Sequence, residues 1–294
     1  MPSALFVGLT TVDLAYGLES YPHEDSKTVA VDQFLGAGGP AANAAVAYAL
    51  LSGESPELVT GLGTHPLADV ARNDLVEHGV TVIDATPGSR HQPPVSSILV
   101  ARKAQSRTIV SLDASRISAS FDNRLAAGVA TAKVVLVDGH YPELALGIAR
   151  EANRAGVPVI LDAGRWKESH LSILPLVDAA IVSSAFEPPD LHTDAASDIA
   201  EYVRSFGPKQ VAITCGADPI RYFRGAHSAE IAVHNAGAID TLGAGDIFHG
   251  AYCYYSAQGY DFAEALECAA KIATLSCQYF GTRQWGTVFT KDPR

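Results

Sequence analysis

Near its carboxyl end the chain reads D-T-L-G-A-G-D, from Asp240 to Asp246, and continues into I-F-H-G-A-Y-C-Y-Y. The small residues are typical of a segment that ends a strand and opens a helix. Such a helix start leaves unpaired backbone N–H groups beside the positive end of the helix dipole, and both favour a bound anion. A carboxylate in the first turn, Asp246, could then accept a proton from an attacking hydroxyl. A glycine-rich turn whose acid only complements the dipole explains the same residues, so both interpretations stay open at this point.

A second glycine-rich helix start precedes it, reading G-A-G-G-P-A-A-N from Gly36 to Asn43. The proline suits a first helical position, the alanines favour a helix over 44–51, and Gly53 suits its end. The amide of Asn43 in the first turn is suited to hydrogen bonds with neutral hydroxyls. The same run formally fits the dinucleotide fingerprint G-x-G-x-x-A, but it follows a polar segment and not the first strand of a βαβ unit. A dinucleotide oxidoreductase is therefore an alternative that absence of NAD(H) binding would exclude.

Short β-branched runs alternate with helical segments, most regularly beyond residue 134, which predicts a parallel sheet covered on both faces. We expect strands or strand-turn units at 4–8, 58–63, 80–83, 134–137, 157–161, 179–182 and 210–214, and helices at 66–78, 143–154, 194–206, 244–257 and 262–279. Two hairpins, 94–100 with 108–112 and 220–223 with 230–233, and an exposed strand at 27–35 complete the pattern. The expected fold is a three-layer α/β/α sandwich in a single domain, 1–294, with a small β lid from about 14–36 and 93–112.

Polar residues follow several of the predicted strands, where the carboxyl ends of parallel strands share one edge of the sheet. Asp13 comes just after the first strand, and Asp138, Asp162 and Thr214 follow later ones. Ligands of open α/β sheets bind at this edge, although a turn or a cap would explain Asp13 as well. We therefore expect these side chains to converge on one site.

Composition limits the class of partner. Lys and Arg number 21 against 32 Asp and Glu, and the net charge of −11 disfavours nucleic acid and anionic membranes. The four cysteines show no C-x-x-C spacing and are expected to be reduced. The start has no signal-peptide pattern, and no apolar run reaches the roughly 18 residues of a membrane helix. The cytoplasm is the expected location.

Taken together, these motifs resemble the PfkB carbohydrate-kinase family, which has the ribokinase-like fold, nearest its ketohexokinase and ribokinase side. The resemblance covers nearly the whole chain. It rests on a strand followed by an acid (Asp13), the G-G-x-x-x-N element (Gly38, Gly39, Asn43), lid-like strands preceded by Y-P-x-E-D-S-K (21–27), a T-x-G element (Thr214, Gly216) and the D-T-L-G-A-G-D motif.

The resemblance implies an enzyme that transfers the γ-phosphate of ATP to a hydroxyl of a ketohexose or pentose, with Mg²⁺. It implies Asp246 as the base and the amides of Gly243, Ala244 and Gly245 as the anion hole. The implied sugar-binding residues are Asp13, Gly38, Gly39, Asn43, Asp138 and His140. The implied nucleotide-binding residues are Thr214, Gly216, Thr241, Gly243, Gly245, Ala270 and Ala273. Glu187 would support the metal through water, and a homodimer would form through the β lid.

The chain departs from the family pattern at two places. The N-x-x-E element before the nucleotide strand reads Ser184-x-x-Glu187, and Pro219 stands where T-x-G-x-x-G has its second glycine. Arg165 and Lys167 follow a strand end, where they are either surface cations or partners of a substrate anion, and His140 is either a sugar contact or a buried, satisfied histidine. A nucleoside kinase of the same fold and a non-catalytic sugar-binding regulatory protein remain alternative functions.

Overall fold

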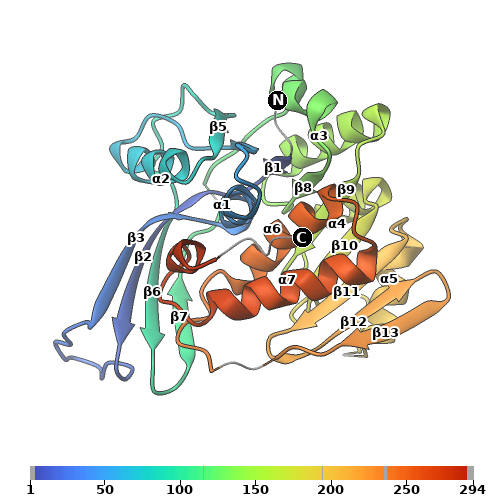
Figure 1. Cartoon of the computed structure of the whole chain (residues 1–294). Helices are drawn as coiled ribbons and strands as arrows, with labels where there is room; N and C mark the ends of the chain where they lie inside the picture. The colour runs from blue at the N-terminus through green and yellow to red at the C-terminus, as the bar shows by residue number, and fades with distance from the viewer. Residues whose placement is uncertain (1–3, 115, 194, 235–236, 290–294) are drawn as a thin grey trace.

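A large, mostly parallel sheet lies between two layers of helices, and a small second sheet projects from one side (Figure 1). The computed structural model describes residues 4–114, 116–193, 195–234 and 237–289. The strands of the large sheet, in spatial order, are β13 (His227–Ile231), β12 (Asp218–Arg224), β11 (Gln210–Cys215), β10 (Ala179–Ser183), β9 (Val159–Ala163), β8 (Val135–Val137), β1 (Leu5–Val7), β4 (Glu57–Thr60) and β5 (Thr81–Asp84). The strands from β11 to β5 pair in parallel, whereas β12 and β13 form an antiparallel hairpin at one edge. The predicted α/β/α sandwich is confirmed.

Alternation along each strand sends side chains to two separate cores, since successive residues of a strand point to opposite faces. In β1, Phe6 packs with the helices α1, α6 and α7, whereas Leu5 and Val7 pack with α3 and α5. Both faces are apolar, which explains the continuous hydrophobic runs in the sequence. The helices are α1 (Pro40–Ser52), α2 (Pro66–Glu77), α3 (Pro142–Ala155), α4 (His170–Ile173), α5 (Ala196–Ser205), α6 (Ala244–Ala257) and α7 (Phe262–Ser276).

The ends of α1 follow the predicted signals, and α7 has a start signal that was not predicted. Helix α1 has its proline in the first turn and ends on Gly53 with φ 71°, a left-handed conformation that glycine adopts without a Cβ penalty. Helix α7 begins with a capping box, in which Asp261 and Glu264 each accept from the other's backbone N–H at 2.9 Å. The sequence did not predict α4 or the 3₁₀ segments η1 (Asn123–Thr131), η2 (Leu174–Leu176) and η3 (Gln284–Thr287).

The small sheet has the order β3-β2-β6-β7, with β3 (Asp32–Gly38), β2 (Thr11–Leu18), β6 (Val95–Ala101) and β7 (Ser106–Val110). The predicted β6–β7 hairpin is confirmed. The prediction was wrong for Asp13, which lies inside β2 and not in a loop after β1, because residues 11–18 pair with β3 on one side and β6 on the other. It was also wrong for 27–35, since β3 begins at Asp32 and extends through the glycines to Gly38.

Three smaller points complete the comparison with the predicted elements. Helix α5 begins at Ala196, and the predicted start at residue 194 lies outside the described residues. Helix α7 ends at Ser276, three residues before its predicted end. In the described part of the chain, no helix combines the length and apolar character needed to cross a membrane.

Candidate active site

Two residues of the motif, Asp240 and Gly243, fix the conformation of the chain at the start of α6. The buried carboxylate of Asp240 accepts hydrogen bonds from the N–H groups of Leu242 at 2.8 Å and Gly281 at 2.9 Å, which ties the loop to the segment after α7. Gly243 precedes the helix with φ 68°, and a Cβ there would lie 2.6 Å from the methyl group of Thr282. Only glycine fits that position.

No side chain caps this end of α6 among the described residues. Of the amides expected to form the anion hole, Ala244 donates to the carbonyl of Thr241 over a long 3.3 Å, and Gly245 is exposed at the helix start. The uncapped N–H groups and the helix dipole make this end electropositive within an acidic protein. An anionic group is the ligand it suits best.

The two glycine-rich helix starts meet at one hydrogen bond. Asn43, in the first turn of α1, donates from its Nδ2 to Oδ2 of Asp246, in the first turn of α6, at 2.8 Å. The two helices pack closely because Gly250 of α6 rests against the backbone of Ala44, where a Cβ would lie 2.2 Å from the carbonyl oxygen. The predicted hydroxyl end and the predicted anion end are therefore parts of one site.

The carboxyl group of Asp246 lies among other charged groups. Desolvation raises the pKa of Asp246 to about 7, and the negative charges of Asp162 and Asp13 act in the same direction. The hydrogen bond from Asn43 and the positive charge on His249 oppose the rise. A carboxyl group with a raised pKa in a cleft is suited to accept a proton at neutral pH, once it is ionised.

His249 lies one turn after the start of α6 and contacts one of these carboxyl groups, that of Asp162. Its Nδ1 is 2.7 Å from the carbonyl oxygen of Gly245 and 3.3 Å from Oδ2 of Asp162, and its Nε2 is 3.2 Å from the carbonyl oxygen of Ile181. The geometry at Nδ1 favours Gly245, so Asp162 interacts with the ring mainly by charge. Burial raises the pKa of Asp162, whose Oδ2 has no hydrogen-bond donor in the described residues.

Asp13 is a buried acid on β2 whose charge acts on Asp246, and the glycine at position 38 leaves room for its carboxyl group. Its Oδ1 accepts from the hydroxyl of Thr11 at 2.6 Å, and burial raises its pKa. A Cβ at Gly38 would lie 1.9 Å from Oδ2 of Asp13, and a Cβ at Gly39, which has φ 95°, would lie 2.4 Å from the carbonyl oxygen of Leu9. Gly38 is therefore required to make room for the carboxyl group of Asp13, and Gly39 is required for the close approach of the backbone to Leu9.

Asp138 and His140 lie nearby. The carboxylate of Asp138 already accepts several hydrogen bonds from the protein, which leaves it less able to bind a ligand. The carboxylate of Asp138 accepts from the N–H groups of Leu9 at 2.8 Å, Ala41 at 3.3 Å and His140 at 3.0 Å. It therefore joins β8 to the chain after β1 and to the start of α1. Burial lowers the pKa of His140, so its neutral form is favoured. The ammonium group of Lys167 donates to the carbonyl of Asp138 at 3.1 Å, which places this cation at the same edge of the sheet.

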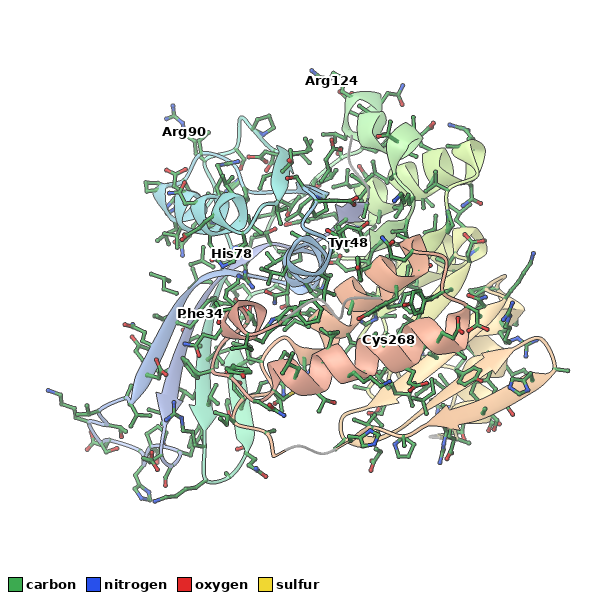
Figure 2. All side chains as sticks on the ribbon, in the orientation of Figure 1. Phe34, Tyr48, His78, Arg90, Arg124 and Cys268 are labelled. Carbon is green, nitrogen blue, oxygen red and sulfur yellow. The ribbon has the colours of Figure 1, made fainter. Side chains whose placement is uncertain are left out.

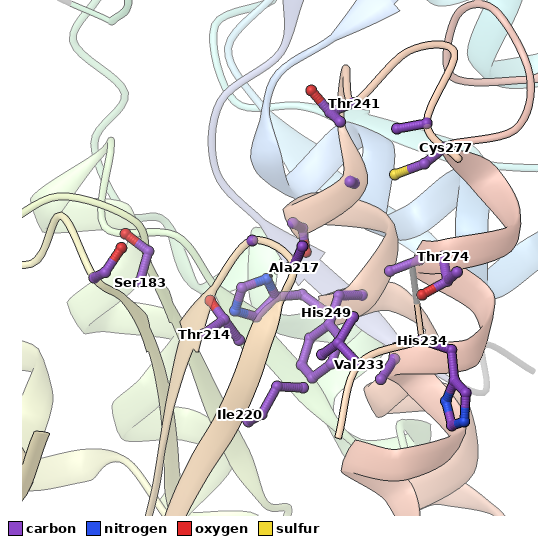
Figure 3. A pocket seen from close by; sticks show the side chains of 18 of the residues that line it. Ser183, Thr214, Ala217, Ile220, Val233, His234, Thr241, His249, Thr274 and Cys277 are labelled. Carbon is purple, nitrogen blue, oxygen red and sulfur yellow. Dashed lines mark hydrogen bonds between the residues drawn. The ribbon is translucent and has the colours of Figure 1, made fainter. Parts of the chain in front are cut away.

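A cavity of about 370 Å³ opens beside the start of α6, between β11, the β12–β13 hairpin and α7 (Figure 3). Its lining includes six of the residues expected to bind a nucleotide: Thr214, Gly216, Thr241, Gly245, Ala270 and Ala273. The remaining one, Gly243, adjoins the cavity through its neighbour Ala244. Phe248, Ile220 and Val233 give the cavity an apolar wall suited to a planar base.

The expected metal-supporting residue lies apart from this cavity. Glu187 is exposed and lines a neighbouring hollow, which shares only Ser184 with the cavity beside α6. In the described ranges, no group of three or more His, Cys, Asp or Glu side chains is arranged to hold a metal ion. A divalent cation here would need ligands from a bound phosphate group and water.

Two arginines that sequence reasoning missed also reach the site. Arg107, on β7 of the small sheet, donates to the hydroxyl of Thr241 and lines the cavity. The available signal was the basic segment 102–107 between the two predicted hairpin strands. Arg283, in the segment after α7, donates to the side chain of Asn43 at 3.0 Å. Nothing in the sequence around Arg283 indicates this contact.

Comparison with known proteins agrees with this geometry. The model of the family described as pfkB family carbohydrate kinase matches residues 1–287. The chain belongs to this family. This pfkB-family protein is therefore a phosphotransferase that acts on a hydroxyl group of a carbohydrate.

Relatives of this pfkB-family kinase include two kinds of sugar kinase. It is 24% identical to a ribokinase of Bacillus subtilis over 96% of this chain and 95% of the relative. It is also 24% identical to a ketohexokinase of Mus musculus, over 93% of this chain and 95% of the relative. The structure of Arabidopsis thaliana ribokinase complexed with ribose and ATP superposes with a TM-score of 0.75 at 22% identity, covering 95% of this chain and 94% of that one. The ribokinase-like fold of this kinase is thus shown, and its acceptor sugar is left open.

Proposed function

We propose that this kinase transfers the γ-phosphate of ATP to a hydroxyl of a ketohexose or pentose, with Asp246 as the general base. The observation that carries the proposal is the hydrogen bond from Asn43 to Asp246, because it joins an amide suited to hydroxyls and a carboxyl group suited to act as a base. A relative's structure was solved with ribose and ATP, which supports the pairing of these two substrates.

In this proposal, each part of the site has one task. Asp13, Gly38, Gly39 and Asn43 bind and orient the sugar, with Asp138 and His140 at the edge. The cavity along Thr214, Gly216, Ala270 and Ala273 receives the nucleotide. Asp246 accepts the proton of the attacking hydroxyl as its oxygen bonds to phosphorus and ADP leaves, while the amides of Gly243, Ala244 and Gly245 stabilise the transferring group.

Mg²⁺ fits this site only with help from the substrate. Because the described residues offer no three-ligand cage, the ion would be held by the phosphates and by water, with Glu187 at a distance. When bound, it neutralises phosphate charge. Arg107 is the protein cation best placed to add to that effect, since it reaches the cavity from the small sheet.

The small sheet is proposed to act both as a lid and as a dimer contact within one domain. It exposes the large apolar side chains of Leu35 and Val110, which are 56% and 70% exposed, and Val29, in the chain just before β3, is 81% exposed. Exposed apolar clusters of this kind mark interaction surfaces. Light scattering should give twice the monomer mass, and Val110→Lys should shift it toward the monomer. A monomeric wild-type protein at micromolar concentration would refute the dimer.

The function is tested by measuring ADP release with ATP and Mg²⁺ over a panel of ketohexoses, pentoses and nucleosides. We expect saturable turnover with at least one sugar and a loss of several powers of ten in Asp246→Asn, while both substrates still bind. Turnover with adenosine or inosine alone would instead identify a nucleoside kinase. Sugar-induced thermal shifts without turnover would indicate a non-catalytic sugar-binding protein.

A further inference from the structure

Arg283 is a buried side chain that joins four parts of the chain. Its Nη1 donates to Oδ1 of Asn43 at 3.0 Å and to the hydroxyl of Thr282 at 2.8 Å. Its Nη2 donates to the carbonyl of Ala37 at 2.7 Å and to Oδ2 of Asp74 at 2.8 Å, and its Nε also donates to Asp74. Only 8% of the residue is exposed. The guanidinium is thus fixed between α1, α2 and the end of β3.

This contact decides which way the amide of Asn43 points. An asparagine side chain carries one acceptor oxygen and one donor nitrogen, whereas a guanidinium can only donate. Because Arg283 donates to Oδ1, the NH₂ group of Asn43 must face the opposite direction, where it donates to Oδ2 of Asp246 at 2.8 Å. The reversed amide would place its NH₂ against the guanidinium and its oxygen against the carboxylate, so it is disfavoured at both ends.

We propose that Arg283 is a positioning residue that holds the amide of Asn43 as a donor toward Asp246 and so keeps the general base ionised near neutral pH. The inference rests on the proposed role of Asp246 as the base. It assigns to the segment after α7 a part in the chemistry, although Arg283 does not itself contact Asp246 in any hydrogen bond of the described residues.

The charges around Asp246 show why one hydrogen bond matters there. The negative charges of Asp162, at the end of β9, and Asp13, on β2, oppose its ionisation, and His249, on its own helix, favours it. Desolvation adds to the opposition, so the carboxylate depends on its donors. Within the described ranges, the bond from Asn43 is the one side-chain hydrogen bond that favours the charged form of Asp246.

Arg283 is itself held firmly enough to serve this purpose. Although burial acts to raise the pKa of Asp74, hydrogen bonds from His78 and Arg283 and the charge of Arg283 bring it to about 2, so its anion persists at physiological pH. His78 lies 3.3 Å from the other carboxylate oxygen. The guanidinium also lies 5.7 Å from the ring centroid of Phe34, and Figure 2 labels both Phe34 and His78.

A purely structural ion pair between the carboxyl-terminal segment and α2 is the competing explanation, and a pH profile separates the two. If Arg283 only anchors the segment, its loss lowers stability without changing the titration of Asp246. If it orients Asn43, its loss lets the amide reverse, the carboxylate loses its donor, and its pKa rises. Since the base must be ionised, the acid limb of kcat/KM then moves to higher pH.

The experiment compares Arg283→Met and Arg283→Lys with the wild-type kinase. Lysine keeps a cation for Asp74 if methionine leaves too little stability to fold, but its single ammonium group cannot also reach Asn43 and Ala37 with the same geometry. The matched control is Arg72→Met, also on an α2 ion pair, in which Arg72 donates to Asp84 at 3.2 Å and to the carbonyl of Gly63 at 2.9 Å.

Two readouts are needed: kcat/KM for the accepted sugar from about pH 5 to about pH 9, and the titration of Asp246 in ¹³C-aspartate-labelled protein, assigned with Asp246→Asn. We expect the acid limb of kcat/KM and the titration midpoint of Asp246 each to move up by about one pH unit in the folded Arg283 variants. Neither should move in Arg72→Met. Turnover on the acid side should fall about tenfold and recover at high pH.

Two results would overturn the positioning role, and a third would overturn the base assignment. An unchanged limb and an unchanged Asp246 titration in a folded Arg283 variant would overturn the positioning role while leaving the base assignment intact. A shift of the same size in Arg72→Met would also overturn it, because that variant leaves Asn43 untouched. Normal turnover in Asp246→Asn would remove the base assignment itself, a separate failure that this variant alone detects.

Discussion

Gly250→Ala should damage both stability and catalysis, although alanine is the better helix former. A Cβ at this position of α6 would lie 2.2 Å from the carbonyl oxygen of Ala44 and 2.8 Å from the Cβ of Ala47, both on α1. The first of these atoms belongs to backbone, so it cannot rotate away. The helices would have to separate by about 1 Å to restore ordinary contact.

The magnitude follows from two opposing terms. Replacing glycine by alanine in a helix stabilises by about 1 kcal/mol, whereas overpacking a close contact costs about 1–3 kcal/mol and adds strain. We therefore expect a net loss of up to about 2 kcal/mol in the free energy of unfolding. Because the same separation moves Asn43 away from Asp246, we expect kcat to fall about 100-fold, the usual effect of a 1 Å misplacement.

Urea unfolding and steady-state kinetics on the same preparations measure both effects. Ser256→Ala is the control, a half-buried position later in α6, and it should change stability and kcat little. A Gly250→Ala variant that is as stable as the wild type and retains its kcat would refute the argument that this glycine sets the distance between the two helix starts.

Three further outcomes follow from the site. The kcat/KM of the wild-type kinase should fall as the pH drops below about 7, because protonation of Asp246 removes the base; a profile flat down to pH 5 would contradict the assignment. Asp246→Asn should unfold at a higher urea concentration than the wild type at pH 8 but not at about pH 4. The pKa of Asp246 is higher in the folded state than in the unfolded state, so the stability of the wild type falls as the pH rises between these two pKa values. Asp240→Ala should lower the free energy of unfolding by about 1–3 kcal/mol, measured by urea denaturation, because two buried N–H groups lose their acceptor.

The large sheet was predictable because its signals are local. Buried strands such as β8 and β9 are short apolar runs, and the helices between them carry their own start and stop residues. The two glycine-rich helix starts were also recognisable for this reason. Their glycines are required by steric contacts close by in the chain or by local backbone conformation, as the left-handed backbone of Gly243 shows.

The small sheet was harder to predict because its strands are defined by their partners. Strand β2 follows β1 after a short interval and has an almost continuously buried pattern, so the sequence offers no clear boundary between them. The outcome for Asp13 follows from this: its residue type pointed to the site, but its place on β2 depends on pairing with β3 and β6. Arg283 shows the limit most clearly, since its hydrogen bond to Asn43 spans 240 positions.

The site contains buried acidic side chains that work against the stability of the fold. Asp13, Asp162 and Asp246 have raised pKa values because each is desolvated, and two of them repel the third. Burying like charges together works against folding, so the arrangement persists only because the two apolar cores stabilise the helices and strands that carry it. The charges and hydrogen-bond donors near Asp246 offset part of this cost. In the proposed mechanism, His249, Asn43 and, through Asn43, Arg283 favour the charged form of Asp246, whereas burial favours its neutral form.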